Sequence, residues 1–83
     1  MLLSFLSQAQ VGTRNQRNSY RLQQGMTLSQ ALRLMGPAQR TEVNPLSPQE
    51  VVYTYDPPAL ASSEVAFSVG PNRRVTHISH GLD

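Results

Sequence analysis

Few side chains in this sequence have the chemistry of a catalytic or metal-binding group. His77 and His80 are the only groups that titrate near neutral pH. They lie three residues apart, so on a strand they would face opposite sides, and no third His, Cys or nearby carboxylate accompanies them. Ser79 and Asp83 add the residue types of a triad, but a triad needs side chains that converge from separate elements. We therefore expect that the chain has no metal site, no cofactor and no catalytic centre, and that it is not an enzyme.

The remaining acidic residues and the glycines give no further chemical pattern. The five carboxylates are scattered, and no two form a spaced pair on one expected element: Glu42, Glu50, Asp56, Glu64 and Asp83. The glycines lack the spacing of a phosphate-binding loop and are typical of caps and turns. The chain has no Cys, which excludes disulfides and thiol chemistry.

The basic residues are all arginine, seven in number, and the net charge is only +2. Arg14, Arg17 and Arg21 are spaced three and four residues apart, so on a helix they would form one basic stripe. Such a stripe could contact phosphate in lipid head groups or in nucleic acid. The favoured alternative is a solvated face, because no Lys accompanies the arginines. The small net charge argues against a dedicated nucleic-acid binder.

A short helix is predicted between Thr27 and Gly36, with signals at both ends. Thr27 is a good N-cap, and Gln30, three residues later, completes a capping box. Gly36 supplies the left-handed residue that ends the helix, and Pro37 prevents its continuation. The apolar residues at i, i+3, i+4 and i+7 share one face: Leu28, Ala31, Leu32 and Met35.

Residues 1–19 are interpreted as an N-terminal extension, ahead of a domain over residues 20–81. The short apolar run at its start is either the tail of a secretory signal or a short helix that packs Leu3 and Leu6 on the domain. Residues 11–19 have the composition of a linker or a solvated helix. No apolar run approaches the roughly 20 residues that a membrane helix needs.

The second half of the chain predicts strands. Residues 51–55, 64–69 and 74–79 are rich in β-branched or alternating apolar residues, and residues 70–73 have the composition of a hairpin turn. Residues 41–43 could start an edge strand before Pro45 interrupts it. The expected fold class is α+β, with one or two N-terminal helices packed on a three-stranded antiparallel sheet. The expected core comprises Leu28, Leu32, Met35, Tyr53, Val65, Phe67 and Val69.

The last predicted strand contains a conflict in its alternation. Val75 and Ile78 have opposite parity, so both cannot face the core of a flat strand. One of them would then join Val52 and Thr54 on the uncovered sheet face, and we predict a partner surface made of Val52, Thr54 and Ile78. Two alternatives stay open: a bulge near His77 turns both residues inward, or the N-terminal leucines cover them.

Several short segments together resemble a known family. Its pattern places Gly-Met-Thr before a helix, Gly and Pro after it, paired tyrosines in a strand, and a final hairpin. The corresponding positions here are Gly25-Met26-Thr27, Ala31, Gly36-Pro37, Tyr53-Thr54-Tyr55, Val65-Ala66-Phe67 and Arg74-Val75. Over about residues 20–81 the chain resembles the SmpA/OmlA (BamE-like) domain family, whose layout is shared with the β-lactamase inhibitor protein-like fold.

This resemblance implies a non-enzymatic adaptor of the bacterial cell envelope, periplasmic or secreted. Such an adaptor contacts envelope proteins or lipid head groups, and supports outer-membrane protein assembly or envelope integrity. Two positions depart from the family pattern: Gly36 directly precedes Pro37, and no lipidated Cys is present, so no membrane anchor is implied. The alternatives are a small inhibitor or regulator of another enzyme and a weak Arg-mediated nucleic-acid binder.

Overall fold

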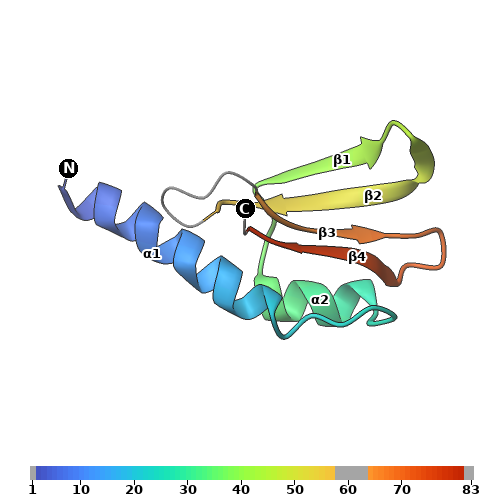
Figure 1. Cartoon of the computed structure of the whole chain (residues 1–83), viewed down its shortest axis with the longest axis horizontal. Coiled ribbons are helices and arrows are strands. Elements are labelled where there is room, and N and C mark those ends of the chain that lie inside the picture. The colour runs from blue at the N-terminus through green and yellow to red at the C-terminus, as the bar shows by residue number, and fades with distance from the viewer. Residues whose placement is uncertain (1, 58–63, 82–83) are drawn as a thin grey trace.

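The computed structural model describes residues 2–57 and 64–81, with side chains from residue 11 onward. Two helices lie on one side of a four-stranded antiparallel sheet (Figure 1), so the predicted α+β class is confirmed. The strands follow one another across the sheet in chain order. The elements are α1 (Leu2–Ser19), α2 (Leu28–Met35), β1 (Arg40–Asn44), β2 (Ser47–Tyr55), β3 (Val65–Val69) and β4 (Val75–His80).

The prediction of three strands is wrong by one, because the segment before Pro45 is a full edge strand, β1. Pro45 and Leu46 form a tight turn between Asn44 and Ser47, which pair with each other. The Asn44 side-chain oxygen accepts a hydrogen bond of 3.0 Å from the Leu46 amide, which stabilises this turn. Proline therefore reverses the chain here and does not end the sheet.

Helix α2 begins and ends where the sequence predicts. The Thr27 hydroxyl accepts from the Gln30 amide at 3.2 Å, and the Gln30 side chain accepts from the Thr27 amide at 3.0 Å. At the other end Gly36 has φ 78° and ψ −171°, an extended conformation with positive φ that only glycine adopts readily. The chain leaves the helix extended and runs directly to β1.

The side chains between α2 and the sheet form the core. Of the predicted core residues Met35, Val65, Phe67 and Val69 are buried, whereas Leu28, Leu32 and Tyr53 are half-buried and pack against them. The Phe67 ring stacks with two tyrosine rings of β2, with centroid distances of 5.0 Å to Tyr53 and 6.1 Å to Tyr55. Further buried apolar side chains complete this core: Leu22, Ala31, Tyr55 and Val75.

A hydrogen bond from the sheet holds the end of α2. The Tyr55 hydroxyl donates to the Gly36 carbonyl at 2.7 Å. Burial, together with the neighbouring Tyr53, raises the pKa of Tyr55 to about 12, so this donor keeps its proton at neutral pH. This bond links the end of α2 to the end of β2.

The last turns of α1 also contact the sheet. Asn15 and Ser19 are buried, and Asn15 Nδ2 donates to the backbone carbonyl of Asp56 at 3.2 Å. The Ser19 hydroxyl lies 2.9 Å from His80 Nδ1, and the His80 ring stacks on Tyr20 at a centroid distance of 4.2 Å. Among the described helices none is both long and apolar enough to cross a membrane. The predicted contacts of Leu3 and Leu6 fall outside the described side chains.

The capping box gives a direct test of α2. Thr27→Ala should lower the free energy of unfolding by roughly 0.5–2 kcal/mol, because the Gln30 amide loses its acceptor. Urea unfolding followed by circular dichroism measures this change. Thr27→Ser keeps the hydroxyl and is the matched control. Equal unfolding midpoints for the two variants would show that the box contributes nothing.

Candidate partner-binding surface

Neither helix covers the opposite face of the sheet, and we call this face the open face. The strand register aligns its side chains in two rows that cross the sheet. One row is Arg40, Thr54, Ala66 and Ser79, and the next is Glu42, Val52, Ser68 and His77. This face is mainly polar, with aliphatic side chains only near its centre.

Of the three residues predicted as a partner surface, Ile78 is on the other face. It pairs with Phe67, and Phe67 pairs with Tyr53, so all three point toward the helices. The cause is a bulge at Thr76: Ser68 pairs with His77, whereas Val69 pairs with Val75. The extra residue resolves the parity conflict as one of the open alternatives predicted, because it turns both Val75 and Ile78 inward.

Val52 and Thr54 do lie on the open face, but they differ in exposure. Val52 is half-buried, and Thr54 is only 5% exposed. A partner can therefore reach Val52 but has little access to Thr54. The structure therefore does not bring the three predicted residues together. The accessible part of that surface is Val52, together with the other residues of its row, Glu42, Ser68 and His77.

A polar cluster around Glu50 lies at one end of the open face. Its carboxylate accepts from Asn44 Nδ2 at 3.2 Å and from the Thr76 hydroxyl at 3.3 Å, and lies 3.6 Å from His77 Nδ1. The Glu50 side chain is 17% exposed, whereas that of His77 is 72% exposed. The cluster connects β1, β2 and β4. The sequence contained no signal for it, because these residues meet only through the strand register.

Arg40 forms the second charged group of this face. Its guanidinium donates to Glu64 at 2.7 Å and to Glu42 at 2.9 Å. The hydrogen bond with Glu64, followed by that with Glu42, raises the pKa of Arg40 above its ordinary value. Because all three side chains are about half exposed, solvent screens these pairs, and they contribute little to stability.

The predicted arginine stripe is not a single helical stripe. Arg14 and Arg17 lie in α1, but the helix ends at Ser19, and Arg21 lies in the following turn. Of the two interpretations of residues 11–19, the helix is the correct one, and it ends before Arg21. All three side chains are exposed.

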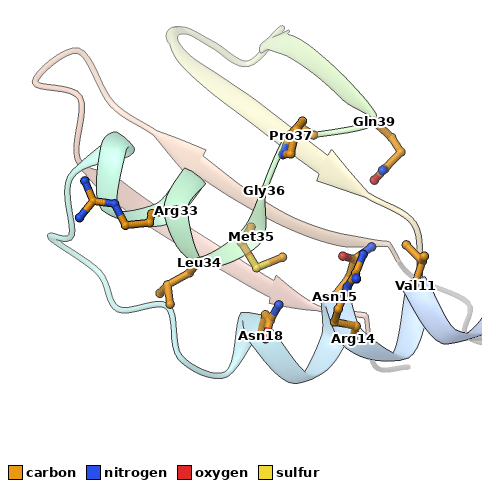
Figure 2. A pocket seen from close by; sticks show the side chains of 11 residues that line it. Val11, Arg14, Asn15, Asn18, Arg33, Leu34, Met35, Gly36, Pro37 and Gln39 are labelled. Carbon is orange, nitrogen blue, oxygen red and sulfur yellow. The ribbon is translucent and has the colours of Figure 1, made fainter.

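A groove of about 540 Å³ lies between α1 and the end of α2 (Figure 2). Arg14, Asn15 and Asn18 approach it from α1, whereas Arg33 in α2 points away from the others. Its remaining lining is Val11, Leu34, Met35, Gly36, Pro37, Ala38 and Gln39. The groove offers amide and guanidinium donors, and its lining contains no nucleophile or carboxylate.

Within residues 2–57 and 64–81 no three His, Cys, Asp or Glu side chains gather as they would around a metal ion. Comparisons of this chain with protein-family models, with curated proteins and with solved structures found no match. The resemblance to the SmpA/OmlA family therefore rests on the short motifs alone.

We expect substitutions on the two faces of the sheet to change the free energy of unfolding by different amounts. Ile78→Thr should lower the free energy of unfolding by roughly 1–2 kcal/mol, because Ile78 packs against the buried core. Val52→Thr should change it by less than about 0.5 kcal/mol, since Val52 lies on the face that no helix covers. Chemical denaturation of both variants checks this order. A larger loss for Val52→Thr would mean that the open face is buried in solution.

Proposed function

We propose that this chain is a non-enzymatic interaction module of the bacterial cell envelope, which binds an envelope protein through the open face around Val52. The fold supports an interaction role because both helices pack on one side of the sheet, so neither of them covers the other side. The segments from Gly25 to Thr27, with Gly36 and Pro37, support the assignment to the envelope through their resemblance to the SmpA/OmlA family. A role in outer-membrane protein assembly or envelope integrity follows from that resemblance.

The observation that carries this proposal is the composition of the open face. Its half-buried centre, Val52, has Glu42 and Ser68 as cross-strand neighbours, His77 lies further along the same row, and Glu50 lies two residues before Val52 on β2. An aliphatic centre within a polar rim is the usual anatomy of a transient protein interface. Among the described side chains of this face three carboxylates, Glu42, Glu50 and Glu64, accompany one guanidinium, Arg40, so the remaining negative charge favours a partner that presents basic side chains.

Other ligands fit the open face less well. Lipid head groups and nucleic acid would be attracted to Arg14, Arg17 and Arg21, which lie in and after α1, not on this face. Inhibition of another enzyme would use the same kind of protein contact. An inhibitor is therefore distinguished from an envelope adaptor by the identity of the protein that it binds.

Site-specific photo-crosslinking tests the proposal. A photoreactive phenylalanine analogue replaces Val52 in one variant and Gln23, an exposed residue beside α2, in a control variant. In a bacterial envelope extract, the analogue at position 52 should form an adduct with an envelope protein identified by mass spectrometry, and the control should not.

A charge substitution then measures the contribution of this face. Val52→Lys should weaken binding of the purified partner roughly tenfold or more, since it places a cation in the contact centre. Gln23→Lys adds the same charge elsewhere and should leave affinity unchanged. Adducts only with cytoplasmic proteins or hydrolases, only from position 23, or none at all, would contradict the proposed function.

A further inference from the structure

Among residues 2–57 and 64–81, strand β1 is a free edge of the sheet, whereas the opposite edge at β4 is partly covered. The Val75 amide donates to Met26 at 2.8 Å, and the Gly25 amide donates to Val75 at 2.8 Å, so the segment before α2 occupies that edge. Within the described chain no segment pairs with the outer side of β1. Four of the five residues of β1 are exposed, and Val43 is 57% exposed. A free edge of this kind offers hydrogen bonds to another strand.

The backbone groups that point outward from β1 can be identified. The Gly70 amide donates to the Arg74 carbonyl at 3.1 Å, and alternate residues of an antiparallel strand point to opposite neighbours, so Ser68 bonds to β4 and Phe67 bonds to β2. Tyr53, the partner of Phe67, therefore bonds to β3, and the residues on either side of it, Val52 and Thr54, bond to β1. Their partners at positions 42 and 40 direct their amides and carbonyls toward β2. Thr41 and Val43 direct theirs outward.

The charges on β1 favour a second copy of the same strand. Arg40 and Glu42 lie two residues apart on the open face, on either side of Thr41. If two β1 strands pair antiparallel with Thr41 opposite Thr41, Arg40 of each copy lies opposite Glu42 of the other. A register centred on Glu42 would instead place two carboxylates face to face. The register with complementary charges is also the one in which the outward groups of Thr41 bond to each other.

We propose that this chain forms a symmetric dimer through β1, with the two-fold axis between the Thr41 residues. The axis is perpendicular to the sheet, so both helix layers lie on one side and both open faces on the other. The two sheets join into one. A contact of five residues per strand buries less area than a permanent interface, so we expect a weak dimer that exchanges with the monomer.

The charge pattern gives a test by complementation. Arg40→Glu and Glu42→Arg each place like charges opposite one another in the dimer, so each variant alone should dimerise roughly tenfold or more weakly than the wild type. Mixed together, the two variants restore both opposite-charge pairs and should form a heterodimer. Sedimentation velocity at low salt, over concentrations up to near millimolar, measures all three samples, and circular dichroism verifies that each variant is folded.

Cysteine crosslinking tests the register separately. The chain has no Cys, so Thr41→Cys introduces the only thiol. Across a hydrogen-bonded antiparallel pair the Cα atoms are about 5.5 Å apart, a distance that a disulfide can span. Mild oxidation should therefore give a covalent dimer. Val43→Cys is the control, because its two copies would be roughly 13 Å apart in this register.

Each outcome decides the proposal. A concentration-dependent dimer, its loss in both charge variants, its return on mixing, and a disulfide at position 41 but not 43 would support it. A wild-type chain that stays monomeric at the highest concentration would overturn it, as would a dimer that Arg40→Glu leaves intact or a faster disulfide at position 43. Since these measurements use the purified chain alone, they do not depend on an envelope partner.

Discussion

The bulge at Thr76 is the constraint on which both faces of the sheet depend. By adding one residue to β4, it turns Val75 and Ile78 toward the helices, where a small core needs both. It also brings Thr76 and His77 together on the other side, with the hydroxyl 3.1 Å from His77 Nδ1 and 3.3 Å from the Glu50 carboxylate. A single local irregularity thus supplies aliphatic packing to one face and a hydrogen-bonded cluster to the other.

Local signals predicted much of this fold. The cap at Thr27, the exit at Gly36 and the alternation around Phe67 each depend on residues close in sequence, and the structure agrees with all three. The sequence predicts one strand too few, because Pro45 after residues 41–43 indicates a break in strand pairing. A proline that lies in the turn itself removes no hydrogen bond from the ladder, so it is compatible with a hairpin.

The candidate surface was less predictable, because it depends on register and on what covers each strand. Alternation placed Val52 and Thr54 on the correct face but could not show that Thr54 is buried. The conflict between Val75 and Ile78 was visible in the sequence, but a bulge and a two-sided sheet satisfy it equally well. The edge position of β1 and the partners of Glu50 follow from contacts between distant segments, about which the motifs carry no information.

The chain-order arrangement of the strands has a consequence for folding kinetics. Each strand pairs with its neighbour in the chain, so the sheet forms by closing short loops, and low contact order is associated with fast folding. The contact between Ser19 and His80 joins residues that are 61 positions apart, and it cannot stabilise the chain until the sheet has formed. We expect α1 to dock late and to separate first when the native state opens, which native-state hydrogen exchange would detect as the lowest protection among the helices and strands. In this order of events the sheet is the folding nucleus. Helix α1 docks on it afterwards and connects an early segment of the chain to β4, the last strand.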